Sequence, residues 1–233
     1  MRNILMSLSL AGGLAAALPA CTTVQPALPA ALMQDAATLP IKGANGLRGT
    51  VSMQTLDGRE VRAPYSGYGQ STTVFGTAER RKFKTRFTVE VEDTPTVSAD
   101  CRADVRNMTL NQVGVSVQTV PMTYGCVFER GGEPVGALDL SELGEGRVSD
   151  RSATLSLYGR TLNVLSLHRD DVSGMTLAYP IAYELREGGR VVASVNVAGD
   201  RALVAKRSID PETEEAVRLG AIALSVLSDP ATN

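Results

Sequence analysis

The chain has 233 residues, of which 43% are hydrophobic and 21% charged, so disorder along its whole length is excluded. Its 23 Lys and Arg residues nearly balance 25 Asp and Glu residues, and the net charge of −2 excludes a strongly basic nucleic-acid-binding protein. One His and three Cys residues leave few groups for metal or nucleophilic chemistry.

Residues 1–20 have the pattern of a signal peptide. Arg2 precedes an apolar run over residues 4–18 that only small residues interrupt. This run is shorter than the roughly 20 residues that a membrane-spanning helix needs. We therefore expect the segment to be cleaved and not to anchor the protein as a helix.

The end of this run, Leu18-Pro19-Ala20-Cys21, resembles the lipobox of bacterial lipoproteins. The resemblance implies that Cys21 is the first residue of the mature protein and carries lipid, so that the membrane is a partner; several acyl chains hold a protein where one is marginal. Thr22 in place of Asp implies, by analogy with lipoprotein sorting, the periplasmic face of the outer membrane and not the inner membrane. The alternative is an ordinary secretory signal peptide that leaves Cys21 unmodified.

Residues 21–46 are rich in Ala, Pro and Thr and show no sustained hydrophobic period. Such a segment buries too little apolar surface to offset the entropy of ordering it. We expect the lipidated cysteine to be followed by an extended tether, and residues 47–229 to form a single β-rich domain.

Apolar and polar residues alternate after residue 46. The alternation is clearest over residues 82–92, where Phe83, Thr85 and Phe87 alternate with charged residues. We therefore expect one face of this strand to be buried and the other to be exposed to solvent. Similar patterns, with turns at Asp57-Gly58 and Tyr158-Gly159, predict further strands. These strands span residues 47–56, 60–65, 113–120, 123–129, 135–140, 154–167, 181–185 and 191–197.

The register of the last hairpin can be predicted from its apolar residues. They occupy odd positions on both sides of the turn, and they face one another if Leu185 lies opposite Val191 across a three-residue loop over residues 187–189. A two-residue Gly188-Gly189 turn would pair residue 185 with 192 and place apolar residues against polar ones.

A helix is predicted over residues 210–228. Asp210 is a typical N-cap, followed by Pro211 and by Glu residues in the first turn. From residue 216 the helix is apolar on every side, which is typical of a helix surrounded by protein. We therefore predict a mostly β protein, an antiparallel barrel or half-barrel that encloses or packs on the apolar C-terminal α-helix. In outline this resembles the tubby-like C-terminal fold; the alternative is a sandwich with the helix across one face.

Cys101 and Cys126 are the two cysteines that remain once Cys21 is set aside. They do not form a CxxC pattern, and the single His leaves no zinc-binding set, so neither a metal nor another cofactor is predicted. In an oxidising compartment we expect the two to form a disulfide.

Two local patterns are candidate binding sites. Lys82, Lys84 and Arg86 alternate along one strand, which places them on its outward face about 7 Å apart, where an anionic envelope component could bind; the simpler interpretation is a solvated face that discourages edge pairing. The segment Tyr65-Ser66-Gly67-Tyr68-Gly69 could present aromatic rings on a Gly-rich loop. Its simpler interpretation is a turn with core-facing tyrosines.

The sequence assigns no catalytic residue. His168 precedes Asp170 and Asp171, a combination that can act as a general base, although a strand end entering a polar turn is the simpler interpretation. Motifs of serine nucleophiles, zinc proteases and phosphate-binding loops do not occur in the sequence. We predict a non-enzymatic binding or structural module whose partner is an anionic envelope component or an envelope protein. The alternatives are an envelope hydrolase or transferase that uses carboxylates near His168, and an accessory subunit with an exposed apolar patch.

Overall fold

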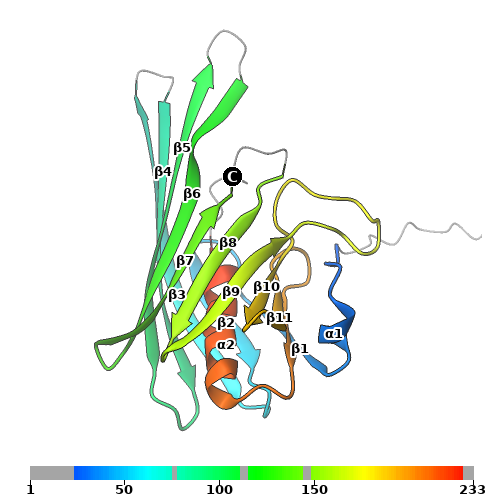
Figure 1. Ribbon diagram of the computed structural model, residues 1–233. Helices are drawn as coiled ribbons and strands as arrows, with labels where there is room; N and C mark the ends of the chain where they lie inside the picture. The colour runs from blue at the N-terminus through cyan, green and yellow to red at the C-terminus, as the bar shows by residue number, and fades with distance from the viewer. Residues whose placement is uncertain (1–23, 75–77, 111–114, 144–147, 228–233) are drawn as a thin grey trace, which may run out of the picture.

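The computed structural model describes residues 24–74, 78–110, 115–143 and 148–227. Within them, one antiparallel sheet of twelve strands has the order β1-β12-β11-β10-β9-β8-β7-β6-β5-β4-β3-β2 (Figure 1). The predicted signal peptide and Cys21 lie outside the described residues. The elements are α1 (Ala30–Met33), β1 (Ala36–Pro40), β2 (Arg48–Gln54), β3 (Glu60–Val74), β4 (Ala78–Val91), β5 (Val97–Leu110), β6 (Val115–Arg130), β7 (Glu133–Glu142), β8 (Arg151–Leu157), β9 (Arg160–Leu167), β10 (Ala182–Glu187), β11 (Arg190–Asn196), β12 (Ala202–Lys206) and α2 (Pro211–Ser225).

The sheet curves into a nearly closed barrel. From β2 to β12 each strand pairs with the next along the chain, and β1 adds to the free side of β12. A bridge between Lys42 and Ser52 then joins the chain after β1 to β2, with N–H to carbonyl distances of 2.9 and 3.0 Å. The fold is thus mostly β and barrel-like, as predicted, and not a sandwich.

Helix α2 lies inside this barrel (Figure 1). The side chain of Asp210 accepts hydrogen bonds from the backbone N–H groups of Glu212 and Thr213, which confirms the predicted N-cap. Every residue from Ala216 to Ser225 is buried, as expected of a helix that the sheet surrounds. The helix ends at Ser225, three residues before the predicted end.

The tether predicted over residues 21–46 is wrong for most of the segment. Ala36–Pro40 is a strand of the barrel, and Leu32 of α1 is completely buried. The Pro-rich composition suggested a segment outside the sheet, but Pro40 is the last residue of its strand. At that position the backbone N–H that proline lacks is not needed for strand pairing. Pairing with β12, which is distant in sequence, supplies the backbone partners that local sequence does not reveal.

The central strands are longer than the sequence indicates. Strand β3 continues to Val74 and not to residue 65, and β6 joins the two strands predicted over residues 113–120 and 123–129, with an irregular register to β5 near Val120. Strand β5 was not predicted, although its odd positions from Val97 to Val105 are apolar and its even positions from Asp100 to Arg106 are charged. In Figure 1, strands β3, β4, β5 and β6 extend past the other strands at one end of the barrel.

The turn predicted for the β10–β11 hairpin is wrong, but the facing of its apolar residues is right. The turn is the two-residue Gly188-Gly189 type, with Glu187 opposite Arg190. A β-bulge after Leu185 then shifts the pairing, so that Leu185 faces Ala193. Without the bulge, this two-residue turn would place the apolar residues of β10 opposite the polar residues of β11. The bulge shifts the register so that apolar residues face one another.

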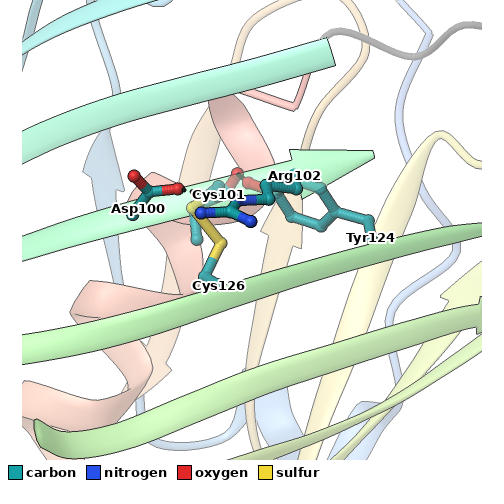
Figure 2. The surroundings of a disulfide bond; sticks show 6 residues. Asp100, Cys101, Arg102, Tyr124 and Cys126 are labelled. Atoms are coloured by element: carbon teal, nitrogen blue, oxygen red, sulfur yellow. Dashed lines mark hydrogen bonds and ion pairs between the residues drawn. A yellow bond between two sulfur atoms is a disulfide. The ribbon is translucent and has the colours of Figure 1, made fainter. Parts of the chain in front are cut away.

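Cys101 and Cys126 form a disulfide, as predicted. The two residues lie directly opposite each other on β5 and β6, and both are buried inside the barrel, on the side of the sheet away from Asp100 and Arg102 (Figure 2). The disulfide therefore links two neighbouring strands covalently from within the core.

Replacing both cysteines by Ala should lower the free energy of unfolding by about 3 kcal/mol, because the unfolded chain is no longer held in a loop of this size. Urea unfolding measures the loss. Reductant should lower the free energy of unfolding of the wild type by a similar amount and leave that of the double variant unchanged. This comparison separates the effect of the disulfide from the effect of the lost side-chain volume. Equal urea midpoints for the variant and the oxidised wild type would contradict the prediction.

Candidate functional site

The outer face of β4 and β5 carries a dense group of charges. Odd positions of both strands point into the barrel, so the even positions point outward in cross-strand pairs such as Lys84 with Arg102 and Lys82 with Asp104. We call the part of this surface that spans residues 80–86 of β4 and 100–106 of β5 the cationic face; its outward charged residues are Arg80, Lys82, Lys84, Arg86, Arg102 and Arg106, with Asp100 and Asp104. Lys82, Lys84 and Arg86 thus share one outward face.

Asp100 organises three of these cations. Its carboxylate lies 3.0 Å from Lys84 Nζ, 2.8 Å from Arg86 Nε and 3.3 Å from Arg102 Nε. Partial burial opposes ionisation, but the hydrogen bonds from Arg86, Lys84 and Arg102 prevail and lower the pKa of the Asp100 carboxyl. Asp100 is therefore ionised at neutral pH and is outnumbered three to one.

Asp104 pairs with Arg80 and lies near the other two cations of the face, Lys82 and Arg106. The hydrogen bonds from Arg80 lower the pKa of the Asp104 carboxyl, and the charges of Arg106 and Lys82 lower it further. Six cations against two ionised carboxylates leave the face with a net charge of +4. Attraction for an anion therefore remains after the internal ion pairs are formed.

A shallow hollow of about 430 Å³ lies on the cationic face. Lys82, Lys84 and Arg102 line it, together with Tyr68 of β3, whose exposed fraction is 62%. A second hollow, of about 350 Å³, continues toward Arg80 and Arg106. The ring of Tyr68 thus lies beside cations on an open surface.

The Tyr-Gly segment is neither a loop nor a turn, because it lies within β3. Tyr65 points inward and is buried, and its hydroxyl donates to the carbonyl of Asn45 at 2.8 Å. Tyr68 points outward onto the cationic face. The two predicted roles are therefore divided between the two residues, one in the core and one on the surface.

The carboxylates near His168 serve the local structure. Asp170 accepts a hydrogen bond from the backbone N–H of Gln25 at 2.9 Å and others from Ser173, and these bonds lower the pKa of the Asp170 carboxyl to about 2. Asp171 is exposed to solvent. A strand end that enters a polar turn, the simpler interpretation, therefore describes this segment.

The imidazole of His168 is buried and has partners at both nitrogens. Nδ1 donates to the carbonyl of Leu177 at 3.1 Å, and Nε2 lies within hydrogen-bond distance of the hydroxyl of Ser166, at 2.9 Å. The Asp150 carboxylate lies 3.4 Å from this same Nε2 and does not orient the opposite nitrogen. This differs from the arrangement in which a carboxylate holds the far side of a catalytic His.

A cavity of about 820 Å³ opens at the end of the barrel where α2 ends. Its wall is mostly apolar and includes two guanidinium groups. Arg201 donates to the carbonyls of Val197 and Ser225, both at 3.2 Å, and burial lowers the pKa of its side chain. Arg151 donates to the hydroxyl of Tyr183 at 3.1 Å. Arg201 thereby binds a carbonyl at the C-terminal end of the helix, where cations are favourable.

Sequence reasoning missed the β5 half of the cationic face. The signal was present, because Asp100, Arg102, Asp104 and Arg106 alternate with Cys101, Ala103 and Val105. These inward residues are small, which makes the apolar face of the strand less conspicuous than that of residues 82–92.

None of the helices in the described ranges is long and apolar enough to cross a membrane. Comparison of the chain with protein-family models, with curated proteins and with solved structures finds no match in any of the three.

Proposed function

We propose that the protein is a lipid-anchored protein at the periplasmic face of the bacterial outer membrane, and that its barrel is a non-enzymatic binding module. The signal-peptide pattern and the lipobox resemblance of Leu18-Pro19-Ala20-Cys21 support the location. The observation that carries the binding role is the cationic face, with its net charge of +4 around an open hollow. Its ligand is an anionic, sugar-containing component of the envelope.

The geometry of the face favours an extended anion over a small enclosed ligand. Successive outward residues on a strand lie about 7 Å apart, so the cations form rows that can contact several phosphate or carboxylate groups at once. Guanidinium groups can bind such groups through two hydrogen bonds. The exposed ring of Tyr68 adds a flat apolar surface on which a sugar ring can stack.

Replacing Lys82, Lys84 and Arg86 together by Gln should weaken binding to purified lipopolysaccharide and flatten its dependence on salt, because the variant loses charges that salt screens. The free energy of unfolding should change little, since exposed ion pairs each contribute about 1 kcal/mol or less. Titration of lipopolysaccharide across a salt series and urea unfolding measure the two effects.

The matched control replaces Arg48, Arg190 and Arg207 by Gln. These three cations are exposed and lie outside the cationic face, so the control makes the same change in net charge. It should bind like the wild type. Equal affinities for the two triple variants at every salt concentration would show that the cationic face has no specific role.

A further inference from the structure

The N-terminal part of the described chain is fixed to the loop between β9 and β10, residues 168–181, which we call the β9–β10 loop. The N–H of Gln25 donates to the Asp170 carboxylate at 2.9 Å, and the carbonyl of Gln25 accepts from the N–H of Asp171 at 2.8 Å. The N–H of Ala27 donates to the carbonyl of Arg169 at 3.0 Å. The chain is therefore held against this loop from its first described residues (Figure 1).

This attachment limits how far Cys21 can lie from the loop. Only four residue steps separate Cys21 from Gln25, and an extended chain covers at most about 3.6 Å per residue. The α-carbons of the two residues are thus no more than about 14 Å apart, whatever path the chain takes. A lipid on Cys21 would bring the membrane surface close to the β9–β10 loop and would leave no long spacer between them.

The β9–β10 loop carries exposed apolar side chains. The exposed fractions are 55% for Val172, 61% for Met175 and 44% for Tyr179. Leu47 is 47% exposed and, together with Tyr179, lines the cavity of about 820 Å³ at the end of the barrel. Single exposed apolar residues are ordinary, but a group of them beside the point from which the anchor emerges suits contact with lipid.

Hydrogen bonds fix the shape of this loop. The Asp170 carboxylate accepts from the N–H of Ser173 at 3.0 Å, and the N–H of Asp170 donates to the carbonyl of Met175 at 2.9 Å. Gly174 supplies the left-handed conformation that the turn needs, with φ of 67°. The apolar side chains are therefore presented by a preformed turn, and contact with the membrane need not order it.

We propose that the β9–β10 loop inserts Val172 and Met175 into the interfacial layer of the membrane that holds Cys21, so that this end of the protein faces the lipid. The proposal rests on the lipid anchor of the proposed function. An acyl anchor and an apolar loop would act together and would also set the orientation, which an anchor on a flexible spacer cannot do.

The chain contains no Trp, so a single introduced Trp reports its own surroundings. We would compare Val172→Trp with the control Val127→Trp, which lies on the outer face of β6 and is 46% exposed. Protein purified from bacterial membranes would be reconstituted into vesicles of zwitterionic phosphatidylcholine with brominated acyl chains, so that the cationic face beside Val127 is not drawn to an anionic lipid surface. Emission from position 172 should shift to shorter wavelength and lose most of its intensity, and emission from position 127 should stay that of a water-exposed indole.

The mass of the purified protein separates the two ways in which this proposal can fail. If Cys21 is acylated and position 172 is not quenched, the orientation is wrong and the anchor stands. If Cys21 is unmodified, the anchor is wrong and this inference falls with it. Equal quenching at positions 172 and 127 would also contradict the proposed orientation. Urea unfolding of Val172→Asp should match that of the wild type, which would confirm that the loop residue is not part of the core.

Discussion

Val217→Asp should prevent the protein from folding. Val217 lies in the middle of α2 and is completely buried, so an aspartate there would place a carboxylate inside the barrel. Burying an ionised group without a partner costs several kcal/mol, which is comparable with the total stability of many domains. We expect loss of soluble protein, or loss of the cooperative thermal transition measured by circular dichroism.

The neighbouring residue shows what a charge on this helix requires. Arg218 is also buried, but its guanidinium lies 3.2 Å from the carboxylate of Glu214, one turn earlier. No such partner is introduced with Val217→Asp. The control Val127→Asp makes the same change on the outer face of β6 and should cost about 1 kcal/mol or less. A folded Val217→Asp protein with the wild-type melting temperature would show that α2 is not enclosed.

Gly136→Ala should be the second most damaging change, although it adds a single methyl group. Gly136 lies in β7 opposite Leu157 of β8. A Cβ atom there would lie 2.1 Å from the carbonyl oxygen of Ser156 and 2.8 Å from the α-carbon of Leu157. Backbone atoms cannot turn aside as a side chain can, so the two strands would have to separate. We expect a loss of about 2 to 4 kcal/mol, at or above the upper end for overpacked positions.

The matched control for this change is Gly125→Ala in β6. A Cβ atom at Gly125 would lie 3.4 Å from the nearest atom, a carboxylate oxygen of Asp139, which is ordinary contact. Because Ala restricts the unfolded chain more than Gly does, this variant should be as stable as the wild type or slightly more so. Urea unfolding compares the two, and similar midpoints for Gly136→Ala and Gly125→Ala would rule out the close approach of β7 and β8.

Sequence patterns predicted correctly those elements that are determined by residues close together in the chain. The Asp210 cap, the all-round apolar helix and the alternation around Phe87 each depend on neighbours in sequence, and each is present in the structure. Strand β1 depends instead on β12, at the other end of the chain, and nothing in residues 36–40 signals that pairing. The bulge after Leu185 is a similar case. It allows a tight Gly188-Gly189 turn and still places the apolar side chains of β10 and β11 opposite one another, and the sequence of the turn alone does not reveal this.

The candidate site was predictable in part for the same reason. The outward direction of Lys82, Lys84 and Arg86 follows from the period of their own strand. The contacts of Asp100 with three cations depend on the register between β4 and β5, which the sequence did not reveal. Tyr68 reaches the same surface from a third strand, so its place beside Lys84 required the full sheet.

The pairing of β1 with β12 has a consequence for the order in which the protein folds. Ala36 lies opposite Lys206, so this pair joins positions about 170 residues apart, whereas most other strands pair with their nearest neighbours along the chain. Hairpins can form early because they close short loops, but contacts of such long range are slow to form. The pairing of β1 with β12 must therefore wait until β12 has formed. Until β1 pairs with it, β12 is an open edge, and such edges are the surfaces most prone to pair with another chain.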